Sequence, residues 1–335
     1  MRPCQGSAPG KVLLWGEYGV LKGAPALVMA INRRVEVTLN PSQRFSLLSA
    51  PPGDFEASVR TQLATLLDEH HIDPRRLDQL AVTIDSSALY QSSETANRKL
   101  GLGSSAAVLA ALDAAVSAMR EGERVCDPVA RLAALQTLHQ SGQGSGVDLA
   151  AATLGGVLNY RRDADGQIQC QPVSWPGALY WAVLWSGQPS SSADHVARFL
   201  RWCEAAPALA EGWIQRSAQC SQAGLAALIG ADIEGVLAAF DEAAELMGTI
   251  GSSLGSALLT PIDIESRKIA QSFDLVYKPS GAGGGDIAVL LGQDAEAMTA
   301  AVQAMQALGL ISLNLEIEHN GARARAHADL DQTGR

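Results

Sequence analysis

The sequence is poor in paired cysteines, in positive charge and in long apolar runs. Its five cysteines are scattered without a CxxC pair, which argues against a disulfide framework or a zinc site and favours a reducing compartment. The 35 Asp and Glu residues outnumber the 25 Lys and Arg residues, and the net charge of −10 disfavours nucleic-acid binding. The most apolar run, residues 178–185, is far shorter than the roughly 20 residues that span a bilayer.

What remains is the composition of a globular protein. The hydrophobic content of 47% can supply a sizeable core, and at about 100–200 residues per domain a chain of 335 residues favours two domains. The N-terminal residues lack the apolar stretch of a signal peptide. We therefore expect a soluble cytoplasmic protein with no nucleic-acid or membrane partner. Its oligomeric state is open between a monomer and a homodimer.

Hydrophobic periodicity predicts a mixed order of helices and strands, which favours an α+β fold in two layers. PALVMAI and RRVEVTLN are expected to be two separate strands. Three helices are expected at roughly 192–205, 207–229 and 232–249. Residues 86–98 are expected to form a polar loop, and the arginines at 323 and 325 a polar tail. A change of composition near residue 176 indicates a domain boundary there.

The most informative motif is KLGLGSSAA, residues 99–107, directly before an expected helix. Its glycines can adopt backbone angles that are closed to other residues. Ser104 and Ser105 place N–H groups and hydroxyls at the positive end of the helix, where they can bind a phosphate and reach Mg²⁺. An ordinary helix cap after a glycine turn is the alternative.

Three further segments can contribute to an anion site. Lys11 lies in an expected buried strand, where its ammonium needs an anion such as Glu17 or a phosphate. Residues 281–285 hold four glycines, more than a turn requires, so their amides can converge on a ligand, although a flexible turn is the alternative. Asp148 opens a short helix, and the helix dipole alone is enough to explain it.

Together these motifs resemble those of the GHMP small-molecule kinases, over about residues 7–292. The resemblance implies a two-domain α+β GHMP kinase fold. Residues 1–175 would form an N-terminal, nucleotide-binding domain like domain 2 of ribosomal protein S5. Residues 176–335 would form a ferredoxin-like C-terminal domain that completes the acceptor site.

Within the family, the details are most similar to the phosphomevalonate kinases. The segments that carry this similarity are KLGLGSSAA, GQGSGVDLAAATLGG, WSGQPSSSADHV and YKPSGAGGGDIAVLL. Two departures lie near the implied acceptor pocket: Ala193 stands where that subgroup often has a lysine, and the glycine segment before Asp148 is short. The resemblance therefore indicates the class of kinase more firmly than it indicates which acceptor the kinase phosphorylates.

The resemblance implies an ATP- and Mg²⁺-dependent kinase that converts 5-phosphomevalonate to 5-diphosphomevalonate in the mevalonate pathway of isoprenoid biosynthesis. The alternatives are a mevalonate kinase, or another GHMP kinase that acts on a hydroxyl group. A related decarboxylase fits the final motifs less well. A non-catalytic ligand sensor on the same fold is an alternative of another class, and the presence of both Lys11 and Asp148 argues against it.

The resemblance also implies roles for individual residues. Lys11 and Asp148 would be catalytic, with Lys11 neutralising the transferring phosphoryl group and leaning toward Asp148. The nucleotide would be held by Lys99, Gly101, Leu102, Gly103, Ser104, Ser105 and Ala106, with Ser105 also on Mg²⁺. The acceptor would be held by Lys11, Glu17, Ser145, Gly146, Ser190, Ser191, Ser192, Ser280, Gly281, Ala282, Gly283 and Gly284. Residues 135–140 offer no carboxylate, only His139, so a second metal ligand stays unassigned.

Overall fold

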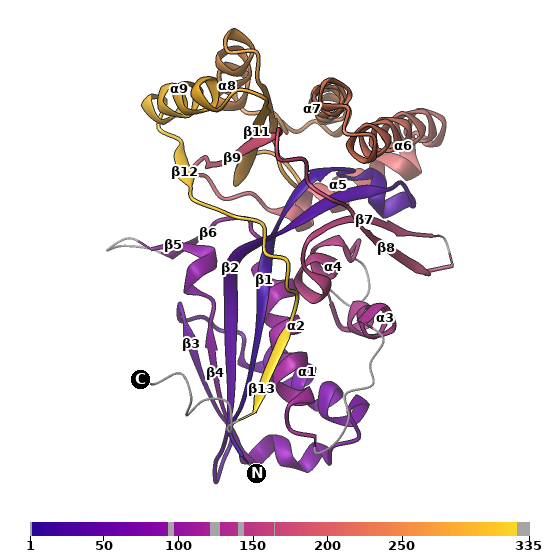
Figure 1. Ribbon diagram of the computed structural model, residues 1–335. Coiled ribbons are helices and arrows are strands. Elements are labelled where there is room, and N and C mark those ends of the chain that lie inside the picture. Colours follow the sequence, from indigo (N-terminus) through magenta and orange to yellow (C-terminus); the bar gives the residue numbers. More distant parts are fainter. Residues whose placement is uncertain (1, 93–96, 121–127, 140–143, 164, 327–335) are drawn as a thin grey trace. The chain divides into compact units, whose positions relative to one another are not determined.

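The computed structural model describes residues 2–92, 97–120, 128–139, 144–163 and 165–326 (Figure 1). The chain forms two compact units that interleave along the sequence. Unit 1 consists of Met1–Lys11, Ala30–Gly156 and Glu318–Arg335, and unit 2 of Val12–Met29 and Val157–Ile317. Each unit therefore combines segments from separate parts of the chain, whereas the sequence analysis expected one boundary after residue 175. The proposed roles of the two halves, nucleotide binding and acceptor binding, stay predictions.

Unit 1 is built on a sheet with the strand order β13-β1-β2-β4-β3. The bounds are β1 Cys4–Trp15, β2 Ala26–Pro41, β3 Ser46–Ala50, β4 Leu80–Asp85 and β13 Arg323–Ala326. The two strands expected for PALVMAI and RRVEVTLN are one continuous strand, β2, because its prolines lie only before it and at its end. β1 and β2 each continue from one unit into the other.

The helices of unit 1 include a buried central one, α2. Their bounds are α1 Glu56–Glu69, α2 Ser104–Ser117, α3 Pro128–Leu138 and α4 Val147–Leu154. Short 3₁₀ turns cover Pro74–Gln79 and Ser87–Leu89. α2 packs directly on β1, since a Cβ at Gly6 would lie 2.0 Å from the carbonyl oxygen of Ala111. The expected polar loop at 86–98 instead contains a paired hairpin, β5 (Tyr90–Ser92) with β6 (Asn97–Lys99), whereas residues 93–96 lie outside the described residues.

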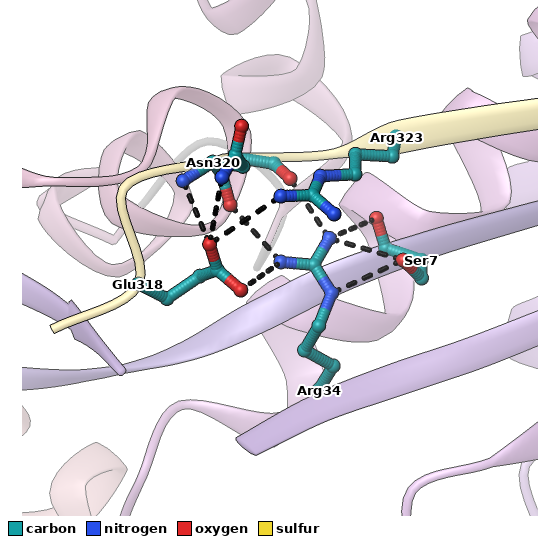
Figure 2. A network of polar contacts seen from close by, with 6 residues as sticks. Ser7, Arg34, Glu318, Asn320 and Arg323 are labelled. Atoms are coloured by element: carbon teal, nitrogen blue, oxygen red, sulfur yellow. Dashed lines mark hydrogen bonds and ion pairs between the residues drawn. The ribbon is translucent and has the colours of Figure 1, made fainter. Parts of the chain in front are cut away.

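A half-buried arginine fastens the C-terminal segment to the sheet of unit 1 (Figure 2). Arg34 on β2 donates hydrogen bonds to Ser7 on β1 and to the carbonyl oxygens of Asn320 and Gly321, and it pairs with Glu318 at 3.2 Å. The expectation of a polar tail at 323 and 325 was wrong, because Arg323 and Arg325 belong to β13, antiparallel to β1.

A buried polar network connects the helices α1, α2 and α3. Asp113 on α2 binds Nε2 of His70 at 2.8 Å and the guanidinium of Arg131, which also reaches Glu69 at 2.9 Å. Burial alone would raise the pKa of Asp113, but hydrogen bonds and positive charge from His70 and Arg131 outweigh burial and lower it. The network therefore favours the ionised carboxylate inside the helical layer.

Unit 2 contains an antiparallel sheet with the strand order β10-β11-β9-β12. The strands of this unit are β7 Val157–Arg162, β8 Ile168–Pro172, β9 Tyr180–Trp185, β10 Val276–Pro279, β11 Ile287–Gly292 and β12 Ile311–Leu313. The β7–β8 hairpin pairs instead with the N-terminal part of β2, Ala26–Met29.

The helices of unit 2 are α5 Ser192–Ala205, α6 Pro207–Ile229, α7 Ile233–Leu254, α8 Pro261–Ser272 and α9 Ala295–Ala307, with a 3₁₀ turn at Gly19–Lys22. One apolar core joins the sheet to α8 and α9, and includes Tyr277, Leu290 and Met305. Over the described residues, no helix is both long and apolar enough to cross a membrane.

Candidate functional site

Three segments of unit 1 meet at the start of α2. β1 carries Lys11, whose backbone N–H donates to the carbonyl of Leu102 at 2.9 Å. α4 carries Asp148 in its first turn, and Lys11 Nζ lies 3.4 Å from Asp148 Oδ1. A Cβ at Gly103 would lie 2.9 Å from Lys11 Cγ and 3.6 Å from Asp148 Oδ2. The loop before α2 can therefore approach the pair this closely only because residue 103 is glycine.

The N-terminus of α2 is left open for a ligand. Its N-cap residue Gly103 has φ +79 and offers no side chain to cap the helix. Among the described residues, the N–H groups of Ser104, Ser105 and Ala106 have no hydrogen-bond partner, and Ser105 is exposed. Free N–H groups and the helix dipole make such a terminus an anion site. Lys11 adds a positive charge beside it.

The other residues expected around this anion site contribute in different ways. Leu102 and Ala106 have buried side chains, so only their backbone groups are available to a ligand. Lys99 ends the β5–β6 hairpin with an exposed side chain. Ser145 Oγ accepts a hydrogen bond from Val147 N at 3.3 Å, and Gly146 is the N-cap of α4 with φ 83.

His139 lies close to this cluster but has no partner among the described residues. Its side chain is 6% exposed, and neither ring nitrogen makes a hydrogen bond. Burial lowers the pKa of His139, while the negative charge of Asp148 opposes the change. Residues 140–143, which lead into the glycine segment, lie outside the described residues. No group of three or more His, Cys, Asp or Glu that could hold a metal occurs in the described part of the chain.

In unit 2, the glycine-rich loop at 281–285 is held in one shape by side chains from other elements. Tyr18 donates its hydroxyl to Ala282 O at 2.5 Å, and Ser190 donates to Gly283 O at 2.6 Å. Ser280 Oγ donates to Leu13 O at 2.8 Å and accepts from Leu13 N at 3.1 Å. These contacts fix the conformation of the loop, which argues against the flexible turn that the sequence left open as the alternative.

The same loop requires glycine and leaves several donors free. Gly283 has φ +74, and a Cβ there would lie 2.7 Å from Leu258 O. A Cβ at Gly285 would lie 2.6 Å from Gln188 O. Within the described residues, the N–H groups of Gly281, Ala282, Gly283 and Gly285 have no acceptor, whereas Gly284 N donates to Leu258 O. Consecutive free amides in such a loop are suited to an anion.

The sequence analysis missed a buried ion pair behind this loop. Lys278 on β10 is fully buried and binds the carboxylate of Glu17, which is 6% exposed. Lys278 Nζ also donates to Pro279 O at 2.8 Å and lies 5.3 Å from the centre of the Phe240 ring. Glu17 is thus paired with Lys278, and the anion near Lys11 in unit 1 is Asp148.

Comparisons with known proteins find curated relatives over nearly the whole chain. No protein-family model matches the chain. A phosphomevalonate kinase of Streptomyces sp. (strain CL190) is 28% identical, with 92% of this chain and 95% of the relative covered. A mevalonate kinase of Thermococcus sibiricus is 25% identical over 95% of this chain and 97% of the relative.

The fold has solved counterparts as well. The structure of Streptococcus pneumoniae phosphomevalonate kinase in complex with phosphomevalonate and AMPPNP superposes with a TM-score of 0.79 and 20% identity. That similarity covers 93% of this chain and 99% of the neighbour, and it confirms the expected two-domain α+β fold. Full-length similarity in sequence and fold, with the glycine loops and the Lys11–Asp148 pair, identifies the chain as a GHMP kinase related to the phosphomevalonate kinases.

Proposed function

We propose that the chain transfers the γ-phosphoryl group of ATP to the phosphate of 5-phosphomevalonate, forming 5-diphosphomevalonate. The single observation that carries this proposal is the Lys11–Asp148 pair beside the uncapped N-terminus of α2. Phosphoryl transfer asks chiefly for positioned cations and N–H donors around the phosphoryl oxygens. The names of the relatives support phosphomevalonate as the acceptor.

The residues before and within the first turn of α2 fit a nucleotide triphosphate. We propose that the free N–H groups of Ser104, Ser105 and Ala106 hold phosphate oxygens, with the loop from Gly101 to Gly103 and Lys99 alongside. The exposed hydroxyl of Ser105 is suited to Mg²⁺, which binds oxygen ligands and often keeps few protein contacts besides the phosphates. When bound, Mg²⁺ neutralises phosphate charge.

The charge of the acceptor determines what Lys11 and Asp148 must do during the transfer. A phosphomonoester has a second pKa of about 6 and is already mostly a dianion near pH 7, so it needs no base. Its difficulty is the repulsion between two polyanions. We propose that Lys11 offsets this repulsion at the transferring group, and that Asp148 mainly holds Lys11 in place.

In unit 2, the glycine-rich loop is proposed to hold the acceptor. The N–H groups of Gly281, Ala282 and Gly283 supply donors, and Gly284 continues the same surface. The hydroxyl hydrogens of Ser190 and Ser280 are already donated to carbonyl oxygens, so these two side chains fix the loop and can only accept from a ligand. Ser191, Ser192, Ser145, Gly146 and Glu17 stay predicted acceptor contacts.

Mevalonate is the second candidate acceptor, because relatives of nearly full length are named mevalonate kinases. The test is ADP release by the purified protein with phosphomevalonate, mevalonate, homoserine and several sugars. We expect phosphomevalonate to give the highest kcat/KM. A higher value for mevalonate would overturn the proposed acceptor, and no ADP release with any alcohol or phosphomonoester would overturn the kinase assignment.

A further inference from the structure

His195 has been given no role so far, although it lies against the glycine-rich loop. It occupies the first turn of α5, and its side chain is half-buried. Its ring packs on the loop backbone, because a Cβ at Gly284 would lie 3.1 Å from His195 Nε2. Its Nδ1 lies 3.4 Å from Ser256 Oγ.

The segment that leads into α5 and the loop form one continuous surface in unit 2. Ser190 Oγ donates to Gly283 O at 2.6 Å, and Ser190 N donates to Asp286 Oδ1 at 3.2 Å. In the opposite direction, Asp286 N donates to Gln188 O at 2.7 Å. These hydrogen bonds hold the start of α5 against the glycine-rich loop, where His195 Nε2 lies next to Gly284.

The ring of His195 is set up as a hydrogen-bond donor. Burial lowers the pKa of His195 and so does the positive charge of Arg198, while Asp194 opposes them, so the ring is neutral near pH 7. When the Ser256 hydroxyl donates to Nδ1, the ring proton is on Nε2. Over the described residues, Nε2 has no hydrogen-bond partner.

We propose that Nε2–H of His195 donates a hydrogen bond to the phosphate group of the acceptor, which makes His195 a specificity-determining residue for phosphomonoester acceptors over plain alcohols. This inference rests on the proposed function. Phosphate oxygens are strong acceptors, and a loop of N–H donors with an added imidazole N–H favours them over a neutral hydroxyl group. Ser256 acts through His195 as a positioning residue.

The test compares His195→Ala and His195→Gln with the wild type, using Arg201→Ala as a control on the same helix with an exposed side chain. For His195→Ala we expect the KM for phosphomevalonate to rise roughly tenfold to a hundredfold, the loss typical of a hydrogen bond to a charged group. The KM for ATP and the kcat should stay within about twofold of the wild type. His195→Gln, which keeps a donor, should recover part of the loss.

A second readout does not depend on turnover. In NMR spectra of the full-length protein, phosphomevalonate should shift the imidazole Nε2 resonance of His195, whereas mevalonate at the same concentration should not. An unchanged acceptor KM in His195→Ala, or equal increases in the KM for ATP and for the acceptor, would overturn the inference and leave the proposed function intact. A wild-type protein that neither binds nor phosphorylates phosphomevalonate would overturn both.

Discussion

The buried Glu17–Lys278 pair offers the sharpest test of how unit 2 is held together. Lys278 is fully buried, and its ammonium is balanced by Glu17 on the strand-to-turn segment after β1. Removing one partner of a buried ion pair costs about 3–5 kcal/mol, because a charge is left uncompensated. In Glu17→Gln the ammonium keeps Pro279 O and the Phe240 ring, so we expect a loss of about 3 kcal/mol in the free energy of unfolding.

The reverse variant should cost less. In Lys278→Met the carboxylate of Glu17 stays beside a small cavity that is also lined by Ser217 and Ser221, whose hydroxyls can turn toward it. We expect a loss of about 2 kcal/mol there, and a coupling of about 2 kcal/mol in the double variant. The exposed pair Glu265–Lys268 is the control, since Glu265→Gln should change stability by less than about 0.5 kcal/mol.

The assay is urea unfolding, with hydrogen exchange of the β10 and β11 amides as the report on unit 2. Losses of less than about 1 kcal/mol in both single variants would refute the reasoning. If Glu17→Gln left stability unchanged and raised the KM for the acceptor, Glu17 would be a substrate ligand, as the family resemblance implies.

Three further predictions concern unit 1. Gly103→Ala should lower kcat at least about tenfold, because the added methyl group would displace Lys11. The control is Gly156→Ala, also at positive φ (+70), where the added methyl group would meet no atom within 4 Å; it should keep its kcat and lose only about 1–2 kcal/mol of stability through backbone strain. Equal kcat values in the two variants would contradict the close approach of Gly103 to Lys11. We expect Lys11→Ala to lower kcat more than Asp148→Asn does, because Asp148 is proposed mainly to hold Lys11 in place. A far larger loss in Asp148→Asn would indicate a base and a hydroxyl acceptor. The pKa of the Asp113 carboxyl is lower in the folded state than its value of about 3.9 in the unfolded state. Its ionised form therefore stabilises the fold at pH values above about 3.9, and this stabilisation is lost as the pH falls through the folded-state pKa. Asp113→Asn should therefore be less stable near pH 6 and lose less stability between pH 5 and 3 than the wild type in urea titrations; parallel pH profiles would contradict this.

Elements with strong local signals could be predicted from the sequence. The helices expected at 192–205 and 207–229 have those bounds in the structure, since Ser191 caps α5 and Pro207 begins α6. Where the sequence failed, the determinant was a distant partner. β13 is short and polar, and it is a strand because it pairs with β1, while the guanidinium of Arg34 holds Asn320 and Gly321 just before it.

The same limit applies to the candidate site. Lys11 and Asp148 are 137 positions apart in the sequence, so their ion pair came from the family resemblance and not from spacing. The Glu17–Lys278 pair spans 261 positions and was missed. The available signal was a lysine in an otherwise apolar strand, which demands a buried anion somewhere in the fold. The burial of His70 at the end of α1 has the same kind of cause, since its hydrogen-bond partner Asp113 lies on another helix.

The central proposal is that the open end of α2 holds the phosphates of ATP, and that Lys11, positioned by Asp148, offsets the charge repulsion during transfer to a phosphomonoester acceptor. Phosphorus NMR of the wild-type protein with MgATP and phosphomevalonate tests it most directly. The account predicts that the monoester resonance gives way to the two coupled resonances of a diphosphate while ADP accumulates, and that Lys11→Ala slows both changes together. A monoester resonance that persists while the same protein phosphorylates mevalonate would contradict the account.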